Sequence, residues 1–556
     1  MSTAIFGSVP VATTLPELLA QAADAVPDHE ALVAGATRWT YSQLADEVAH
    51  AAAALDDIGV GVGSSVALLA PNIAQWVPIA LGAQLVGARV DAFNTWVRAY
   101  DLDYLLRTSG ADVLVTVDTV RSANLIGEIT TLLPELEHNA PGEWRSAAYP
   151  SLRHIAVLGQ QAPRGADRWD DLRKRASGAV ETQRAALRSA PVIDGESVAF
   201  VLYTSGSTKN PKAVPLEQRK LIENGFHIGE RMGLGADDRI WFGSPLFWSF
   251  GCANALMATF THRACFVLQE QFEARAAVAL MAEERVTAAY LLPAMAEALA
   301  AAAPDEMRAL DSLRTGATIG RPDEVERVAL DLGVGEICNV YGATENYGNC
   351  CVTDRRDPLE VRLYTQGRPL PGVEARVVDP ETGELLGRGV PGELHIRGRV
   401  TRGYLNDDEA NAEAFAPDGW YRTGDRMIIN DDGSVTYIGR LNDMIKTSGI
   451  NVSPAEVEGF LTTHPDVAEV VVMGAPHPTR DQVVVAFVVP KTPELTAESV
   501  TDYCRANIAG YKVPWVVSIV SSIPTTGTGK IARRNLLDTA AELVVKEIDR
   551  REGVKQ

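Results

Sequence analysis

One stretch of the chain gathers hydroxyl groups, a glycine and two lysines directly after an apolar run. The apolar run ends at Tyr203, and Thr204-Ser-Gly-Ser-Thr-Lys-Asn-Pro-Lys212 follows it. Backbone N–H groups, hydroxyls and a cation at the end of a strand are suited to binding phosphate oxygens. A polar β-turn has the same composition, so the motif alone leaves both interpretations open. It is not a Walker A loop, because the spacing GxxxxGK is absent here and around Lys530.

Four more polar motifs follow along the chain in a fixed order. Thr344 and Glu345 come after the apolar EICNV, and Asp425 presents a carboxylate at what we expect to be a tight turn. Arg440 lies at the end of a predicted strand, and Lys530 closes the loop PTTGTGK. Taken singly, each motif has a structural explanation as a turn, a helix cap or a solvated cation. Their joint order is too specific for that explanation.

Strands that alternate with helices must position these motifs. Apolar runs predict strands over residues 65–71 and 111–117 and a strand that runs into a Gly/Ser turn over 197–206. Helical patterns cover residues 47–55 and 272–284. Such alternation is typical of parallel α/β sheets.

Two parts of the chain depart from this pattern. Residues 138–175 are irregular and contain Pro and Gly, which predicts a surface loop. After residue 365, short β runs between Pro and Gly turns predict a small barrel or an antiparallel sheet. The last ~115 residues alternate again and are numerous enough for a separate small α+β domain. The elements expected there are helices over 454–463 and 497–508, strands over 467–475 and 483–489, and one later strand.

The length of 556 residues exceeds what one hydrophobic core supports, so the chain must divide into domains. We predict a large N-terminal domain over residues 1–438, with its β-rich part at about 360–438. A hinge is expected at 439–442, and a smaller C-terminal domain over 443–556.

Composition and charge exclude several classes of function. Hydrophobic residues make up 46% and charged residues 22%, as in ordinary globular proteins, and the net charge is −21. This balance argues against a nucleic-acid partner and against docking on anionic membranes. No apolar run reaches the ~18 residues of a membrane span, and signal-peptide, GxSxG and HExxH patterns are absent. Six cysteines without CxxC spacing favour buried thiols in a reducing compartment, so we expect a cytoplasmic protein.

In their order, the five motifs resemble those of the adenylate-forming superfamily, which contains acyl-CoA synthetases, nonribosomal-peptide adenylation domains and firefly-type luciferases. The resemblance runs from about residue 30 to residue 540. It implies an α/β fold with a large N-terminal domain of two α/β subdomains plus a small β-barrel, followed by a mobile α+β C-terminal domain. It also implies a two-step reaction, in which a carboxylate is joined to AMP with release of pyrophosphate and the acyl group then passes to a thiol.

Carried over residue by residue, the resemblance implies a nucleotide site. Thr344 would contact the α-phosphate, and Glu345 would bind Mg²⁺. Asp425 would accept hydrogen bonds from the ribose hydroxyls, and Arg440 would reach the same nucleotide. The residues implied to hold the β- and γ-phosphates of ATP are Thr204, Ser205, Gly206, Ser207, Thr208 and Lys212. The residues implied to line the adenine slot are Gly316, Ala317, Thr318, Asn339 and Tyr341, with Gly342 following in the same motif.

The resemblance further implies that the C-terminal domain serves both steps. Lys530 resembles the lysine that bridges the substrate carboxylate and the α-phosphate during adenylation. The hinge position matches Asn442, where the family more often has Asp or Lys. Rotation about it would withdraw Lys530 and bring Lys446–Asn451 to the site, with Gly449 leaving room for the pantetheine arm of coenzyme A.

The phosphate motif departs from the family pattern TSGTTGxPKG. Lys209 replaces the later glycine and Ala213 replaces another. Glycine permits positive φ and close approach to phosphate, whereas a residue with a Cβ costs ~1–2 kcal/mol in that conformation. The alternative is that Lys209 adds a useful cation. If the loop is impaired, the protein could still run the thioester step from acyl-AMP that a partner adenylating enzyme supplies.

The acid-binding segment departs as well. Trp248 stands where acyl-CoA synthetases commonly carry His and where amino-acid-activating relatives place an Asp, which argues against an amino-acid substrate. The pocket is expected to include Trp248, Phe250, Tyr290 and Asn346. We therefore predict a ligase for an apolar or bulky carboxylic acid that uses ATP or acyl-AMP, Mg²⁺ and coenzyme A. Two alternatives stay open: loading of a separate carrier protein, and a catalytically silent binding protein with the same fold.

Overall fold

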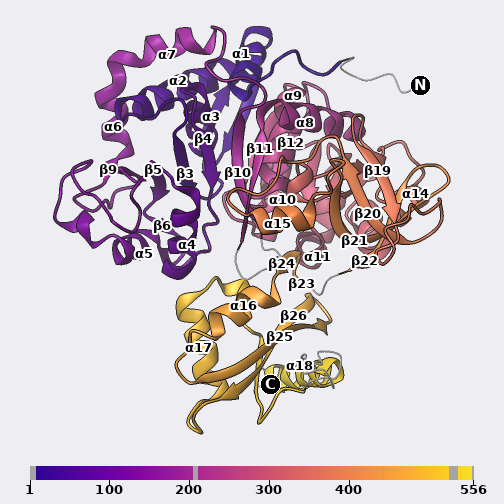
Figure 1. The fold of residues 1–556 in the computed structure, drawn as a ribbon. Helices are drawn as coiled ribbons and strands as arrows, with labels where there is room; N and C mark the ends of the chain where they lie inside the picture. Colours follow the sequence, from indigo (N-terminus) through magenta and orange to yellow (C-terminus); the bar gives the residue numbers. More distant parts are fainter. Residues whose placement is uncertain (1–7, 205–210, 442–443, 525–535, 554–556) are drawn as a thin grey trace. The chain divides into compact units, whose positions relative to one another are not determined.

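The computed structural model describes residues 8–204, 211–441, 444–524 and 536–553 (Figure 1). The packing of the backbone divides the chain into two compact units. The first unit consists of Met1–Thr95, Leu105–Tyr203 and Ala213–Gly439. The second unit consists of Trp96–Tyr104, Thr204–Lys212 and Arg440–Gln556.

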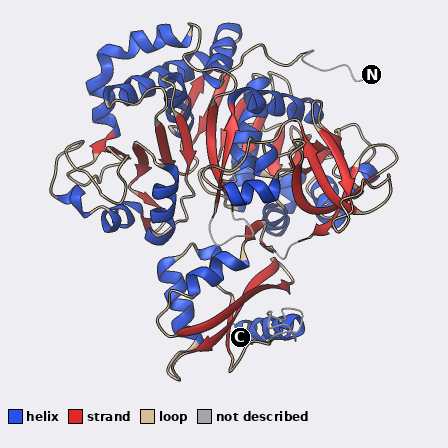
Figure 2. Ribbon diagram, in the orientation of Figure 1, coloured by secondary structure: helices blue, strands red, loops and turns tan. Residues whose placement is uncertain are grey.

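A seven-stranded sheet forms one part of the first unit, in the order β11-β10-β4-β3-β5-β8-β9. Its central strands are parallel, and β3 and β5 are buried at every residue, as strands covered on both faces should be. Figure 2 shows helices packed alongside these strands. The strands predicted at 65–71 and 111–117 are confirmed as β3 and β5, and the strand predicted at the start of 197–206 is confirmed as β10. The Gly/Ser turn expected after it lies outside the described residues. The bounds are β3 Ser65–Leu69, β4 Arg89–Ala92, β5 Val113–Val117, β8 His154–Leu158, β9 Asp167–Arg168, β10 Val198–Thr204 and β11 Lys212–Glu217.

Helices α2 (Tyr41–Asp57) and α3 (Trp76–Leu85) pack closely against each other, and α3 also packs against β3 and β4 of this sheet. The start of α2 is fixed by a capping box, in which the side chains of Thr40 and Gln43 bond each other's backbone N–H groups. All ten residues of α3 are buried. A Cβ at Gly82 would lie 2.8 Å from the backbone nitrogen of Ala52, so glycine is what allows the two helices to approach. The helix predicted at 47–55 lies within α2.

A nine-stranded sheet forms the other α/β part of the first unit, in the order β18-β17-β16-β15-β14-β12-β13-β1-β2. The six strands from β16 to β1 are parallel, and antiparallel strands close both edges. The bounds are β1 Glu30–Ala34, β2 Thr37–Thr40, β12 Arg239–Phe242, β13 Cys265–Leu268, β14 Ala288–Leu291, β15 Thr315–Thr318, β16 Glu336–Tyr341, β17 Cys351–Val352 and β18 Arg368–Pro369. One layer of apolar side chains between this sheet and its helices includes Trp241, Val278, Leu291 and Leu299.

The short β runs after residue 365 form a four-stranded antiparallel sheet, one of the two forms expected from the sequence. Its order is β19-β20-β21-β22. The bounds are β19 Glu374–Val378, β20 Gly392–Arg397, β21 Tyr421–Ile429 and β22 Val435–Arg440. The register of β20 on β21 shifts between Glu393 and His395, which marks a β-bulge.

The prediction of a surface loop over 138–175 is wrong in part. The apolar run His154–Leu158 forms β8, whose three central residues are buried, and helix α6 covers Trp169–Arg175. The strand is only five residues long and lies between Pro- and Gly-containing segments. Those segments indicate loop, so the short apolar run was not predicted as a strand.

The C-terminal part of the second unit is a mixed sheet with helices on it. Strands β24, β23, β26 and β25 follow one another in antiparallel pairs, and β27 pairs with β26 in parallel. The bounds are β23 Ile445–Thr447, β24 Ile450–Val452, β25 Val467–His477, β26 Asp481–Pro490, β27 Val516–Ile519, α16 Pro454–Leu461, α17 Ala497–Asn507 and α18 Leu537–Gly553. Every element expected in this segment is confirmed, whereas α18 was not predicted.

This sheet has an apolar core on each face, because the side chains of a strand alternate between its two sides. Val470, Val472 and Val488 contribute to one core, together with α16 and α17. Val471 and Phe487 contribute to the other, together with α18. The segment therefore carries its own hydrophobic support, as a domain requires.

The remaining helices of the first unit connect the strands or cap their ends. Among them, α10 confirms the helix predicted over 272–284. Their bounds are α1 Leu15–Ala25, α4 Ala99–Ser109 (which the second unit shares), α5 Leu125–Leu132, α7 Val180–Leu187, α8 Gln218–Met232, η3 Ser249–Ala255, α9 Leu256–Thr261, α10 Ala274–Glu283, α11 Pro293–Ala302, α12 Pro304–Arg308, α13 Pro322–Glu326, α14 Leu359–Tyr364 and α15 Asp408–Ala414.

All six cysteines are free and buried, which confirms the prediction that these thiols are buried. The sulfurs of the adjacent Cys350 and Cys351 lie 4.0 Å apart and form no disulfide. Among the described residues, no helix combines the length and the apolar character that crossing a membrane requires.

Candidate functional site

The predicted phosphate motif connects two neighbouring strands of the seven-stranded sheet. Thr204 is the last residue of β10, and Lys212 is the first residue of β11 and is buried. Ser205, Gly206, Ser207, Thr208 and Lys209 lie outside the described residues. The position after Lys212 is closely packed: Ala213 is buried, and its carbonyl accepts a hydrogen bond of 2.9 Å from the backbone N–H of Leu405.

Thr344 and Glu345 lie in a single turn of 3₁₀ helix, η5 (Thr344–Asn346), directly after β16. Glu345 is buried, and its Oε1 accepts a hydrogen bond of 2.9 Å from the hydroxyl of Tyr404. Burial and the neighbouring Glu345 carboxylate raise the pKa of Tyr404 far above its ordinary value, so this hydroxyl keeps its proton. The hydroxyl of Thr344 bonds that of Ser249 at 3.3 Å. These contacts hold the turn after β16 in place from two sides.

Asp425 lies within β21, so the prediction of a tight turn at this carboxylate is wrong. Gly424 has φ of +68°, a left-handed conformation that produces an irregularity inside a continuous strand. Asp425 is 4% exposed, and its Oδ2 accepts a hydrogen bond of 2.7 Å from the hydroxyl of Tyr341. Burial, followed by the nearby Asp425 charge, raises the pKa of Tyr341.

The residues predicted for the adenine slot lie side by side at the carboxyl ends of two parallel strands. Gly316, Ala317 and Thr318 are on β15, and Thr318 is in register with Asn339 on β16. Asn339 is fully buried, and its Nδ2 donates a hydrogen bond of 3.0 Å to the carbonyl of Thr365. The carboxyl ends of parallel strands are where α/β proteins bind nucleotides.

Two glycines in this region are required by close backbone approach. A Cβ at Gly316 would lie 2.0 Å from the carbonyl oxygen of Ala289 on β14. A Cβ at Gly342 would lie 2.2 Å from the carbonyl oxygen of Gly348. No side chain fits at either position, so glycine is what allows the neighbouring backbone segments to approach this closely.

Aromatic side chains gather at the predicted acid pocket. Phe250 lies in the π-helix η3, and its ring centroid is 5.0 Å from that of Tyr290 on β14, in an edge-to-face arrangement. Phe242 packs against the same tyrosine at 6.0 Å. Trp248 and Phe250 are half-buried, whereas Tyr290 is fully buried. Asn346 is buried in η5, where its Oδ1 accepts a hydrogen bond from the backbone of Ala343.

The residues predicted to contact coenzyme A form a hairpin in the second unit. Lys446 on β23 is paired with Asn451 on β24. Ser448 and Gly449 form the connecting turn with φ of +48° and +82°, and no atom lies within 4 Å of a Cβ built at Gly449. Arg440 ends β22, whereas Asn442 and Lys530 lie outside the described residues.

Three residues near these predicted positions were missed from the sequence. Tyr404, Ser249 and Asn254 contact Glu345, Thr344 and Tyr290 respectively. Tyr404 has no sequence signal, because it lies 59 residues from Glu345. Asn254 has a weak signal, since it is a lone amide in the apolar segment after Trp248.

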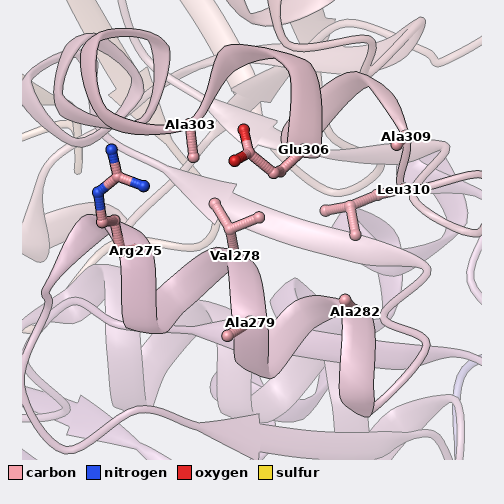
Figure 3. Close-up of a pocket in the computed structure, with 8 residues that line it drawn as sticks. All are labelled: Arg275, Val278, Ala279, Ala282, Ala303, Glu306, Ala309 and Leu310. Carbon is pink, nitrogen blue, oxygen red and sulfur yellow. The ribbon is translucent and has the colours of Figure 1, made fainter.

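A separate cavity of about 380 Å³ lies between α10 and the residues around α12 (Figure 3). Val278 and Ala282 of α10 face Ala303 and Leu310 across it, and Arg275 and Glu306 also line it. It contains none of the residues predicted for the nucleotide or the acid.

The sequence of this chain is similar to those of known AMP-binding enzymes. The family model described as AMP-binding enzyme matches residues 19–405, and that of the AMP-binding enzyme C-terminal domain matches residues 456–530. YngI of Bacillus subtilis, which is named as an acyl-CoA synthetase, is 32% identical over 96% of this chain and 98% of its own length. The mitochondrial medium-chain acyl-CoA ligase ACSF2 of Mus musculus is 31% identical over 95% of this chain and 87% of its own length.

A solved structure shares the fold along almost the whole chain. The anthranilate CoA ligase AuaEII in complex with anthranoyl-AMP superimposes with a TM-score of 0.69 and is 27% identical, covering 97% of this chain and 99% of its own. The chain therefore belongs to the AMP-binding enzyme family, in the acyl-CoA ligase branch of the adenylate-forming superfamily. It is a ligase with an α/β N-terminal domain and a smaller C-terminal domain.

Proposed function

We propose that this enzyme joins an apolar or bulky carboxylic acid to coenzyme A through an acyl-adenylate, using ATP and Mg²⁺. The observation that carries the proposal is two buried carboxylates of the first unit, one in the turn after β16 and one within β21. Glu345 and Asp425 are 7% and 4% exposed, and a tyrosine hydroxyl orients each of them. Buried carboxylates are costly unless they are paired with a cation or hydrogen-bond donors, which a magnesium nucleotide supplies.

The two carboxylates fit different parts of ATP. Mg²⁺ in nucleotide sites is held by one or two carboxylates together with phosphate oxygens, so Glu345 alone is a sufficient protein ligand. Asp425 is acceptor-only when ionised and suits the two hydroxyls of a ribose. Thr344, the residue before Glu345, is proposed to donate its hydroxyl hydrogen bond to the α-phosphate in place of the one it makes to Ser249.

The second step requires a thiol and a second set of residues. We propose that Lys446 and Gly449 contact coenzyme A after the C-terminal domain rotates about Asn442. Lys530 is proposed to act only in the first step, where its cation offsets the charge on the α-phosphate and the substrate carboxylate. The open space around Gly449 supports its assignment to a pantetheine passage.

A thioester-only enzyme is the second candidate, and Lys209 and Ala213 favour it. Ala213 is the second residue of β11, and its side chain is buried. An enzyme of this kind would take acyl-AMP from a partner adenylating enzyme. Loading of a separate carrier protein is the remaining alternative for the acceptor.

A paired assay on the purified protein tests these proposals. One arm supplies carboxylic acids, ATP and Mg²⁺ and follows acyl-AMP by mass spectrometry. The other supplies preformed acyl-AMP with coenzyme A, pantetheine or a carrier protein. Activity in both arms with coenzyme A is the expected result. Activity in the second arm alone would establish the thioester-only enzyme, and activity in neither arm would reject ligase function for the acids supplied.

A further inference from the structure

A buried amide lies beside the aromatic side chains of the predicted acid pocket. Asn254, in the π-helix η3, is fully buried. Its Oδ1 accepts a hydrogen bond of 2.8 Å from the hydroxyl of Tyr290, which is also fully buried. Its Nδ2 has no hydrogen-bond partner among the described residues. A buried donor without a partner is rare in folded proteins and costs free energy until it finds one.

The surroundings place this amide next to the predicted reaction site. Tyr290 on β14 is in register with Ala317 on β15, one of the residues assigned to the adenine slot. The same helix η3 carries Ser249, which bonds Thr344. Phe250, four residues before Asn254, packs against the ring of Tyr290 and is only half-buried. Of these three side chains, Phe250 alone is partly exposed to solvent.

Resting on the proposed function, we propose that Asn254 is a specificity-determining residue whose Nδ2 donates a hydrogen bond to an oxygen of the acid, remote from the reacting carboxylate. Tyr290 is a positioning residue, since its hydroxyl occupies Oδ1 and leaves the N–H₂ group for the substrate. The preferred acid thus carries a carbonyl, ether or hydroxyl oxygen on an otherwise apolar body. A plain hydrocarbon acid would leave the donor unpaired, and sites built around a hydrogen bond discriminate strongly against analogues that lack it.

The test compares matched acids that differ in one oxygen. The panel contains linear and cyclic acids and the corresponding oxo acids, with the ketone moved along the chain. Thioester formation is measured from each acyl-AMP and coenzyme A, and from each acid with ATP, as kcat/KM. Binding of the corresponding acyl-sulfamoyl adenosines is measured by calorimetry, which requires no turnover.

We expect about ten-fold or greater preference for one oxo acid over its hydrocarbon partner. The variant Asn254→Leu, which has the same number and branching of side-chain heavy atoms but cannot donate a hydrogen bond, should bring this ratio close to one while the hydrocarbon acid is still used. Tyr290→Phe should reduce the ratio and keep the aromatic wall. Thermal unfolding of each variant provides the control for folding.

Three outcomes would overturn the proposal. The wild-type enzyme could use both members of every pair equally, which leaves the ligase function standing and removes the role of Asn254. Asn254→Leu could lower both members by the same factor, which would make the residue merely structural. Absence of both turnover and binding with every member would reject the proposed function and this inference together.

Discussion

The hydroxyl of Tyr341 donates a hydrogen bond of 2.7 Å to the carboxylate of Asp425 and so joins the nine-stranded sheet to the small antiparallel sheet. The two residues are 84 positions apart in the chain. Asp425 is proposed to bind the ribose, and its orientation depends on this contact. The hydrogen bond between the two sheets would thus help to position a nucleotide bound by Asp425.

Tyr341→Phe removes that bond and leaves the buried carboxylate short of a donor. We expect a loss of about 1–2 kcal/mol in the free energy of unfolding and a several-fold rise in KM for ATP. Urea denaturation and initial rates measure the two effects. Tyr364→Phe is the matched control, because Tyr364 is 58% exposed and should change neither quantity. An unchanged KM in Tyr341→Phe would contradict the role given to Asp425.

Gly316→Ala places a Cβ 2.0 Å from the carbonyl oxygen of Ala289, where no side chain can move aside. The strands must separate, so we expect a loss of about 2–4 kcal/mol in the free energy of unfolding, measured with urea. Gly335→Ala is the control, since no atom lies within 4 Å of its Cβ position, and it should change stability by less than ~0.5 kcal/mol. Equal stabilities for the two variants would refute this account of Gly316.

Lys530→Ala should lower acyl-AMP formation by about a hundred-fold or more and leave thioester formation from acyl-AMP within a few-fold of wild type. The reason is that the cation acts on charge that develops only in the first step. Single-turnover rates of the two half-reactions provide the measurement. Lys546→Ala, a change at an exposed lysine of α18, controls for the loss of a charge in the same domain. Equal loss of both half-reactions would be incompatible with the role proposed for Lys530.

Lys209→Gly distinguishes a mis-set phosphate loop from a useful extra cation. If the loop requires positive φ at this position, glycine should raise kcat/KM for ATP about five-fold or more. Lys209→Ala removes the charge without freeing the backbone and should produce no such gain. A fall in both variants would show instead that the cation binds ATP. The rate of thioester formation from acyl-AMP should stay constant throughout.

His227 on α8 should make stability depend on pH. Burial, followed by the nearby Arg399 cation, lowers the pKa of His227 to about 4, compared with about 6.5 in an unfolded chain. Between these two pKa values His227 is protonated in the unfolded chain but neutral in the folded protein. The free energy of unfolding therefore decreases as the pH falls from ~6.5 to ~4.

Between pH ~6.5 and ~4, the free energy of unfolding of His227→Gln should fall by about 1–2 kcal/mol less than that of the wild type. This amount allows for the partial exposure of the ring. Urea denaturation at several pH values measures it, and His138→Gln, a change at an exposed histidine, should follow the wild-type curve. Parallel curves for wild type and His227→Gln would disprove the effect.

Elements with a local signal could be predicted from the sequence. The apolar composition of β3, β5 and β10 is enough to predict them as strands, and the same holds for the strands of the C-terminal segment. The five-residue strand β8 was hidden by its Pro- and Gly-containing surroundings. Asp425 was expected at a turn because Gly424 precedes it, whereas the left-handed glycine forms an irregularity within a strand. A glycine signals an unusual φ but not which kind of structure uses it.

The contacts within the candidate site could not be predicted, because they join residues distant in sequence. The bonds Tyr404–Glu345 and Tyr290–Asn254 span 59 and 36 positions. Each depends on how strands are ordered in a sheet, which no local pattern specifies. The motif residues could be recognised by their order along the chain, whereas the tyrosines that orient them became visible only in the folded protein.

Because all six thiols are buried, the rate at which each one is alkylated can report local unfolding of the protein. Alkylating reagents attack exposed thiolates, and burial raises the pKa of Cys265 and Cys504 to about 12. Labelling of the native enzyme therefore waits for a fluctuation that uncovers the sulfur. Cys504 belongs to the second unit and the other five to the first. The labelling rate of each cysteine, followed by mass spectrometry, would time the unfolding of each unit without any introduced probe.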